Sequence, residues 1–518
     1  MNLIKQTHEL THKTFQNQSQ AYTEADIIVP DTKPDIQQIL QATANVSITR
    51  KQIADDKITL ECKAAITTLY LGEGGLVRSI FTHHPFTHTI DAKGSHPMAD
   101  ICETLAIQNV EPLLINSRKF CIKLLIGVGV ELITAQELEF ATDVEEKSDE
   151  PQNAMQKHIA KISANYHRRI AENEFIVREV LDVPAGKASI SEVLHVDATV
   201  ARHESKAAGN KVLVKGDVAI TTMYLAEDES IHSMEHLLPF SEIISAIHEI
   251  TDSSDVIPSF HVQDITWHAQ ANADGELRLF SMDVTLRASL TAEQLTTIEA
   301  LGDIYSTRKE LETHFASVNV TNQIERTPAS VTIADLVRPE ENAPEISQIH
   351  NVQARPHVTD ARIEGSKIVI EGHVALGALY FATSSENPLG TLQKELPFAH
   401  TIETTSHALP ENAHCDVRPK ITHVSHSVNM SGELDFRAVV NLDAQVLEQR
   451  EYKYLADVKE KEPDEREATQ KPYCLRVYFV KQGDTAWSIA KRYRVPVEDL
   501  IERNGSEFTV GQRLILQG

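Results

Sequence analysis

Cysteine is scarce in this sequence, and long hydrophobic runs are missing. The 518 residues include five Cys, none of them in a CxxC pair. This excludes a disulfide framework and a zinc knuckle, and it is typical of reduced thiols in a cytosolic protein. No stretch approaches the roughly 20 apolar residues of a membrane span, and the N-terminal residues MNLIKQTHELTHKTF lack the apolar core of a signal peptide. We therefore expect a chain that stays in the compartment where it is made.

Catalytic motifs are missing as well. The sequence contains no GxxxxGK[ST], HExxH or GxSxG. The net charge of −26 argues against nucleic acid as a partner. The charge is uneven, because residues 473–518 carry seven Lys or Arg against five Asp or Glu, while the remainder has a net charge of −28. The C-terminal end is therefore a different kind of module from what precedes it.

A repeat dominates the rest of the sequence. Three stretches begin with Lys, alternate apolar with other residues and reach a Tyr thirteen residues later. They read KITLECKAAITTLYL from Lys57, KVLVKGDVAITTMYL from Lys211 and KIVIEGHVALGALYF from Lys367. Period-two alternation of this kind predicts half-buried strands.

Other landmarks recur with these stretches. Each copy has an Ile before the stretch, the Tyr within it and a Pro-Phe pair after it, and the Ile and the Tyr both recur at spacings of 154 and 156 residues. The landmarks are Ile36, Ile190 and Ile346; Tyr70, Tyr224 and Tyr380; and Pro85-Phe86, Pro239-Phe240 and Pro397-Phe398. Two sets at the same offsets indicate a tandem array of three related domains. We expect their cores to superpose, with Phe86, Phe240 and Phe398 buried.

We expect a mainly β protein with short helices (α+β), in which three tandem β-rich domains precede a small βααβ module. Asp55-Asp56, Ser117-Arg118 and Asp274-Gly275 predict hairpin turns. Asp31, with Pro34 in the first turn, predicts a short helix. The expected boundaries are 1–21 for a polar N-terminal segment that is poorly ordered or partly helical, 22–142, 174–292 and 328–456 for the repeats, 143–173 for a charged linker or exposed helix, 293–327 for a linker that is helix-prone at first, 457–472 for a charged mobile tether and 473–518 for the C-terminal module.

The histidines do not form a convincing metal site. His83, His84 and His88 surround Pro85-Phe86, but the second repeat has apolar residues at the equivalent places. His423 and His426 would lie on opposite faces of a strand. The abundant carboxylates are best interpreted as a solvated surface. We expect no metal, no cofactor and no catalytic residue.

The C-terminal module contains signals for two short helices. Asp484 or Thr485 can cap the first helix, Val495-Pro496 separates it from the second, and Asn504-Gly505 ends that one. At Tyr478, Val480, Gly483, Asp484, Thr485, Trp487, Ile489, Ala490, Tyr493, Val495, Leu500, Asn504, Gly511, Gln512 and Leu514, and along its whole length, the module resembles a LysM domain. The resemblance implies binding of N-acetylglucosamine-containing glycans between two loops, here residues 483–486 and 504–510, of which the second is short.

Two kinds of ligand are open for this module. The loops supply the expected binding residues Gly483, Asp484, Thr485, Ala486, Asn504, Gly505 and Ser506. Arg492 and Arg494 add positive charge. This charge contributes little to the binding of an uncharged sugar, but it suits the binding of an acidic protein surface. We therefore expect a protein partner, and a peptidoglycan or chitin-like glycan is the alternative.

The repeats resemble the SPOCS domain of spore-coat morphogenetic proteins, through the strand-Tyr-loop-Pro-Phe core and the preceding Pro-Asp-Ile segment. Several SPOCS copies followed by one LysM domain look like the SipL type of protein. That resemblance implies a cytoplasmic mother-cell protein at the forespore surface, which links the coat's basement-layer ATPase to coat assembly with the help of its LysM domain. The leading hypothesis is therefore a non-enzymatic adaptor, and the alternative is a glycan-binding protein of the spore or cell wall. A wall hydrolase is disfavoured because no catalytic constellation is present.

Overall fold

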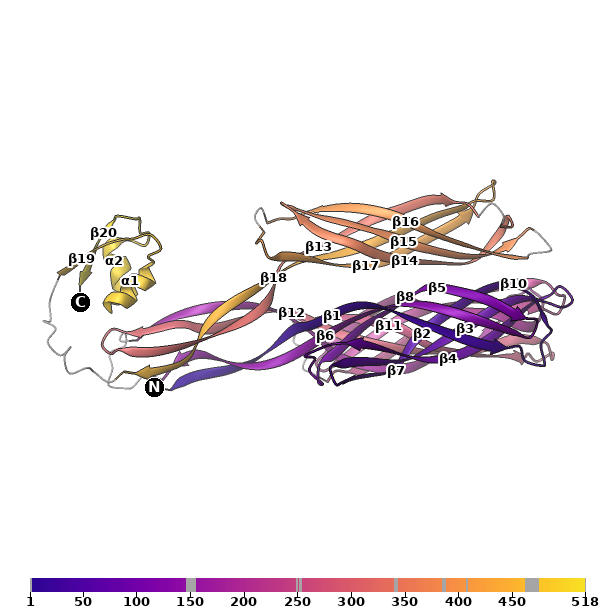
Figure 1. Cartoon of the computed structure of the whole chain (residues 1–518), viewed down its shortest axis with the longest axis horizontal. Coiled ribbons are helices and arrows are strands. Elements are labelled where there is room, and N and C mark those ends of the chain that lie inside the picture. The colour runs from indigo at the N-terminus through magenta and orange to yellow at the C-terminus, as the bar shows by residue number, and fades with distance from the viewer. Residues whose placement is uncertain are drawn as a thin grey trace.

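The structure is a computed structural model, and it describes residues 2–145, 155–247, 250, 254–339, 343–383, 388–406, 409–461 and 475–517. Within these residues the chain forms twenty strands and two helices. Six three-stranded sheets occur in tandem pairs, and the helices belong to a βααβ module near the C-terminus (Figure 1). The expected fold class is thus confirmed.

Each repeat consists of six antiparallel strands in two sheets. The first repeat has β1 (Leu3–Ile28), β2 (Ile36–Ala54), β3 (Lys57–Gly72), β4 (Val77–Asp91), β5 (Asp100–Asn116) and β6 (Lys119–Val144). The second has β7 (Met155–Asp182), β8 (Ile190–Ala208), β9 (Lys211–Ala226), β10 (Ile231–Ser245), β11 (Asp255–Ala271) and β12 (Leu277–Ser306). The third has β13 (Leu311–Val337), β14 (Ile346–Glu364), β15 (Lys367–Ala382), β16 (Leu389–Glu403), β17 (Ala413–Val428) and β18 (Leu434–Glu460).

The repeated stretch forms the central strand of one sheet in every repeat. The sheet orders are β2-β3-β4, β8-β9-β10 and β14-β15-β16, and the partner sheets are β1-β6-β5, β7-β12-β11 and β13-β18-β17. In the first repeat the alternating Ile58 and Leu60 are fully buried in one cluster with Phe120 and Ile122 of β6. The period-two pattern therefore provides the face that packs on the second sheet.

The conserved spacing of the tyrosines has a structural cause. Tyr70, Tyr224 and Tyr380 are all completely buried. Their hydroxyls donate hydrogen bonds to the carbonyl oxygens of Pro34, Ala188 and Pro344, at 3.2, 3.1 and 2.8 Å. Each bond ties the central strand to the segment just before the preceding strand.

Replacing Tyr380 with Phe should lower the stability of the third domain by about 1 kcal/mol, because the partly buried carbonyl of Pro344 loses its donor. Urea unfolding followed by hydrogen exchange in β14 and β15 measures this loss. Tyr22→Phe is the matched control, since the Tyr22 side chain is 60% exposed. Equal effects of the two substitutions would contradict the role of the hydrogen bond.

The Phe of each Pro-Phe pair packs differently in the first repeat. Phe240 and Phe398 are buried, as predicted, but Phe86 is only half-buried. Phe240 lies over Gly216, where an added Cβ would come within 2.6 Å of the ring. Phe86 instead faces Cys62, whose side chain takes that space. The expectation of three equally buried rings is therefore wrong for Phe86.

Beyond the sandwiches, the longest strand pairs continue as three two-stranded ribbons, β1–β6, β7–β12 and β13–β18. Their third strands stop near Ile133, Glu293 and Glu448. We call the ribbon ends beyond these residues the stalk. All three ribbons contribute to each of two apolar clusters in the stalk, in which the rings of Phe140 and Tyr454 lie 4.8 Å apart. The stalk lies at the end of the molecule that carries the C-terminal module (Figure 1).

The stalk corrects several expectations. Residues 3–21, 155–173, 293–306 and 311–327 are strands, although they were expected to be a polar segment, a linker or helix, and a linker. A two-stranded ribbon buries one face, and here it does so against the other two ribbons. In residues 3–21, for example, the buried side chains are Leu10, Thr11 and Ala21, which are too few to give a period-two signal. The domain boundaries themselves stay a prediction, and residues 146–154 lie outside the described part of the chain.

Two shorter segments also differ from expectation. The helix expected from Asp31 is absent, because a turn closed by the Lys33 N–H on the Pro30 carbonyl at 2.9 Å leads into β2. The expected tether begins inside β18, in the stalk, where Val458 is buried in one of the two apolar clusters. The remainder of that tether, residues 462–472, lies outside the described residues. The predicted turns at Asp55-Asp56, Ser117-Arg118 and Asp274-Gly275 are confirmed.

The three domains also meet at their sandwiches. A cluster that includes Leu69, Met223 and Leu379 draws on the first sheet of all three. The contacts recur in a cycle: β8 lies against β4, β14 against β9, and β2 against β16. One chain thus packs its three repeats around a common junction.

Candidate binding module at the C-terminus

The C-terminal module contains β19 (Leu475–Phe479), α1 (Ala486–Tyr493), α2 (Val497–Asn504) and β20 (Arg513–Gln517), as predicted. Strands β19 and β20 pair antiparallel. The two helices and the sheet enclose a small core of Ile489, Ala490, Leu500 and Leu514. This core holds the loops that were expected to bind a ligand.

The first loop is shaped by its own polar residues. Gly483 has a φ of +86°, which favours glycine. Asp484 Oδ2 accepts hydrogen bonds from the Tyr478 hydroxyl at 2.5 Å and the Lys481 N–H at 2.8 Å. The bond from Tyr478 lowers the pKa of Asp484 below its ordinary value. Asp484 therefore serves the loop itself.

Thr485 is the N-cap of α1. Its hydroxyl accepts the Ser488 N–H at 3.1 Å, and the Ser488 hydroxyl accepts the Thr485 N–H at 2.9 Å, which completes a capping box. Gly483 and Thr485 are exposed, and Ala486 is half-buried. The backbone of this loop is thus available to a ligand on its outer side.

The second loop is anchored by Asn504. Its side-chain amide donates to the carbonyls of Leu500 and Ile515 at 2.9 and 3.1 Å, and its oxygen accepts the Ile515 N–H at 2.8 Å. These bonds fix the end of α2 to β20, so Asn504 has a structural role. Gly505 and Ser506 beyond it are exposed.

The two arginines have different surroundings. Arg492 Nη1 donates to the Tyr478 hydroxyl at 2.9 Å, and the side chain remains 51% exposed. Arg494 ends α1 in a left-handed conformation with a φ of +54°. Its guanidinium lies 3.5 Å from the carboxylate of Glu310, at the end of the stalk. The expected basic surface is therefore divided between solvent and the stalk.

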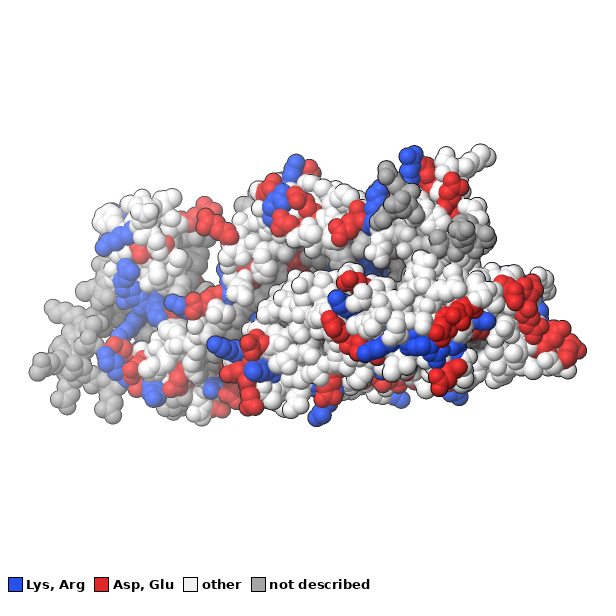
Figure 2. Space-filling model, turned by 45° about the vertical axis from the view of Figure 1, so that its right-hand side comes forward, with Lys and Arg blue, Asp and Glu red and all other residues white. Residues whose placement is uncertain are grey.

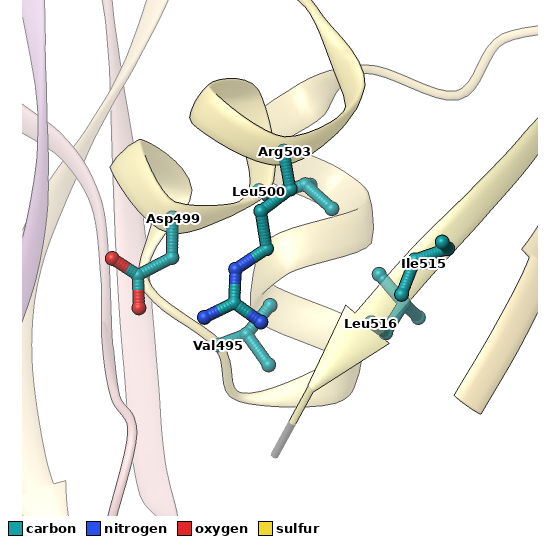
Figure 3. A pocket seen from close by; sticks show the side chains of 6 residues that line it. All are labelled: Val495, Asp499, Leu500, Arg503, Ile515 and Leu516. Carbon is teal, nitrogen blue, oxygen red and sulfur yellow. The ribbon is translucent and has the colours of Figure 1, made fainter. Parts of the chain in front are cut away.

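A small cavity lies inside the module. A cavity between α2 and β20 is lined by Val495, Asp499, Leu500, Arg503, Ile515 and Leu516 (Figure 3). Its volume of about 10 Å³ has room for no more than about one water molecule. Its lining includes no residue of the first loop, so a ligand of that loop would bind outside this cavity.

Two residues that contact the stalk were not in the expected site. The Trp487 indole N–H donates to Asp303 Oδ2 at 2.8 Å, and the Lys491 ammonium pairs with the other oxygen of Asp303. On the face shown in Figure 2, Lys and Arg side chains gather between the module and the stalk, beside Asp and Glu. The sequence carried little signal for this contact, because Trp487 also packs against the core of its own module.

A second concave region separates the first two domains and is lined by charged side chains. It has a volume of about 400 Å³ and includes Lys51, Glu172 and Arg287. Lys51 bonds Glu103 at 2.8 Å and Glu172 at 3.1 Å, and Arg287 pairs with Glu174 at 2.6 Å. The pair between Lys51 and Glu172 joins the first domain to the second, so the region is a contact between domains.

The clustered histidines serve separate contacts. His84 and His88 on β4 hydrogen-bond Thr23 and Ser19 of β1, at 2.8 and 2.9 Å. His83 approaches Asp264 of the second domain at 3.5 Å. Within the described ranges, no group of three or more His, Cys, Asp or Glu is arranged to hold a metal ion. None of the described helices is long and apolar enough to cross a membrane.

Comparison with protein families agrees with this architecture. The SipL, SPOCS domain family matches residues 35–112, 189–269 and 345–429, and the LysM domain family matches residues 478–516. Each SPOCS match starts just before the second strand of a repeat and ends in the fifth or at its end, so the ribbons lie largely outside the matches. Neither the curated proteins nor the solved structures contain a match to the chain.

Both domain types are non-catalytic binding domains, and the SipL family is associated with the spore coat. The order of the matches also agrees with the order of the folded units, three two-sheet domains and then the βααβ module. The chain is therefore a protein of three SipL-type SPOCS domains followed by one C-terminal LysM domain.

Proposed function

We propose that this chain is a non-enzymatic adaptor in spore-coat assembly, located in the mother cell at the forespore surface. Its LysM domain binds a protein, the coat's basement-layer ATPase, and the three SPOCS domains form an acidic scaffold. Tandem modules on one chain raise the effective concentration of each contact, so individually weak contacts suffice.

One observation carries the choice of a protein ligand. The α1 surface of the LysM domain already contacts acidic protein surface, through Lys491 on Asp303 and Arg494 on Glu310. Charge-assisted bonds of this kind suit a protein carboxylate. Arg492 remains half exposed beside them and can add a further contact.

Reversing the charges of Arg492 and Arg494 tests this proposal in the full-length chain. We expect R492E/R494E to bind the purified ATPase about tenfold more weakly or worse, because charge-assisted bonds are replaced by repulsion. The module should stay folded, since its apolar core is untouched. Calorimetric titration measures the affinity, and circular dichroism checks the fold.

Two controls sharpen the result. Arg513→Glu reverses an exposed charge on β20 of the same module, and Glu310→Gln removes the partner of Arg494 without altering the LysM domain. Both should bind the ATPase at least as well as the native chain. If R513E loses as much affinity as R492E/R494E, the loss reflects the net charge of the module and not a specific contact of Arg492 and Arg494.

The alternative is a glycan-binding LysM domain. It is favoured by the family match and by the exposed first loop at Gly483 and Thr485. The same variants are titrated with chitin oligomers and purified spore peptidoglycan. The alternative predicts tight glycan binding that persists in R492E/R494E. This binding should be lost in Thr485→Ala and kept in Thr485→Ser. That set of results would show that the ligand of the LysM domain is a glycan and not a protein.

A further inference from the structure

The LysM domain is seated on the end of the second ribbon. Asp303 of β12 accepts the Trp487 indole N–H at 2.8 Å and pairs with Lys491. Two residues later, the Tyr305 hydroxyl donates to the Val495 carbonyl at 2.7 Å, and its ring meets the edge of Trp487 with centroids 5.0 Å apart. Tyr305 is only 4% exposed and belongs to the core cluster of the LysM domain.

Other residues of the stalk extend this contact. The ring centroid of His158 on β7 lies 5.2 Å from that of Trp487. The Val497 N–H donates to the Gln156 side chain at 3.2 Å. These contacts seat α1 and the start of α2 on both strands of the second ribbon. The end of the third ribbon adds to the seat, because Glu310, which precedes β13, pairs with Arg494, and the Lys491 ammonium lies 5.9 Å from the ring centroid of Phe315.

The pseudo-symmetry of the stalk shows that the contact is selective. Asp143, Asp303 and Asp457 occupy equivalent places after a bulge, and each accepts the N–H of the next residue at 2.8 to 2.9 Å. Asp143 pairs with Lys157 at 2.7 Å, and Asp457 lies 3.8 Å from Lys459. The second ribbon differs in offering Tyr305 beside its aspartate, where the others have Glu145 and Lys459.

The docked position also separates the two faces of the LysM domain. Gly483, Thr485, Gly505 and Ser506 of the two loops remain exposed. Trp487 and Lys491 of α1 are half-buried at the contact, and Val495 is buried. A ligand of the loops can therefore bind the docked domain, whereas a ligand of the α1 surface competes with the stalk.

We propose that the end of the second ribbon is an internal ligand of the LysM domain, which holds it in cis in the resting chain. A protein that binds the α1 surface must displace the stalk, and it should present the same chemistry, a carboxylate with an aromatic ring close to it. This competition rests on the proposed function, but the docking itself does not.

The docking is tested with Trp487 as the reporter. The chain has two Trp, so the background substitution Trp267→Phe leaves Trp487 as the only tryptophan, which is excited selectively at the red edge of absorption, where Tyr does not absorb. In the full-length chain, D303N keeps an oxygen that accepts the Ile304 N–H. It removes the negative charge of the carboxylate that pairs with Lys491 and accepts the indole N–H of Trp487. We expect the ratio of docked to released LysM domain to fall about tenfold or more, seen as a red-shifted emission and easier acrylamide quenching.

The equivalent substitutions D143N and D457N are the matched controls and should leave Trp487 protected. Lys491→Gln approaches the contact from the other side and should release it as D303N does. Equal quenching of all these variants and the native chain would overturn the docking. If the protection of Trp487 from acrylamide disappears when the protein is diluted, the LysM domain contacts the stalk of a second chain and does not dock in cis.

Titration with the basement-layer ATPase then separates the two proposals. If the docking and the proposed function are both correct, D303N binds the ATPase more tightly than D143N does. The gain in affinity should equal the factor by which D303N lowers the ratio of docked to released LysM domain. If D303N frees Trp487 but no variant binds the ATPase, the docking stands and the proposed function fails. If D303N frees Trp487 and binds the ATPase with unchanged affinity, the competition between stalk and partner is wrong.

Discussion

Replacing Phe240 with alanine should lower the free energy of unfolding of the second domain by about 3–5 kcal/mol. The ring is buried in the core of that domain, and its centroid lies 5.6 Å from that of Phe175 and 5.3 Å from that of Phe260. It also covers Gly216, which has no side chain to refill the space. Its loss therefore leaves a cavity between the two sheets.

The measurement needs to resolve single domains, because a chain of three domains need not unfold in one step. Urea unfolding with hydrogen exchange in β9 and β10 reports the second domain. Phe398→Ala should have the same effect in the third domain. Phe86→Ala is the matched control, and its half-buried ring should cost clearly less. Equal losses at Phe86 and Phe240 would contradict this account of the Phe-Gly packing.

Removing the charge of Glu293 should weaken the contact between the second and third domains. Its carboxylate is 6% exposed and receives a hydrogen bond from His167 at 2.9 Å. Arg418 of β17 pairs with it as well, and Arg326 of β13 lies 3.5 Å away. One buried charge thus ties two strands of the third domain to the second.

The pH dependence follows from the state of this carboxyl group. Burial by itself raises the pKa of Glu293, but the hydrogen bond from His167 and the charge of Arg418 outweigh it and lower the pKa from 4.5 to about 2. A group whose pKa falls on folding stabilises the fold while it is ionised. Its contribution of about 3 kcal/mol is fully present above pH 4.5 and is lost as the pH falls towards 2.

Glu293→Gln should therefore be about 3 kcal/mol less stable at pH 7 and should lose less stability than the native chain between pH 4.5 and 2. Urea unfolding at a series of pH values measures both. Glu299→Gln is the control on the same strand, because its pair with Lys161 is exposed and contributes about 0–1 kcal/mol. A pH profile of E293Q parallel to that of the native chain would refute the prediction.

Local features of the fold were readable from the sequence because they depend on neighbouring residues. The alternation through Ile58 and Leu60 predicted the central strand, since one face of a strand follows from period two alone. Asp484 or Thr485 was predicted as the helix cap, and Thr485 is the one that caps α1; such a cap is readable because the groups that it binds lie within three residues. The exposed positions of Gly483 and Gly505 follow from the same local geometry, but their role in binding stays a prediction.

The contacts of the LysM domain were beyond such reasoning. Trp487 and Asp303 are 184 residues apart, and nothing close to either residue indicates the other. Phe86 shows the same limit on a smaller scale. Its exposure depends on Cys62 across the sheet, where the other repeats have glycine.

The sequence by itself determined the three copies, their β-rich character and the LysM domain at the end, because spacing and local period carry that information. Only the tertiary structure decided that residues 3–21, 155–173 and 311–327 are strands and that the LysM domain sits on the second ribbon. The physical reason is shared. Each ribbon buries its apolar face against ribbons from the other repeats, so its stabilisation arises between distant segments and leaves little periodic pattern within any one of them.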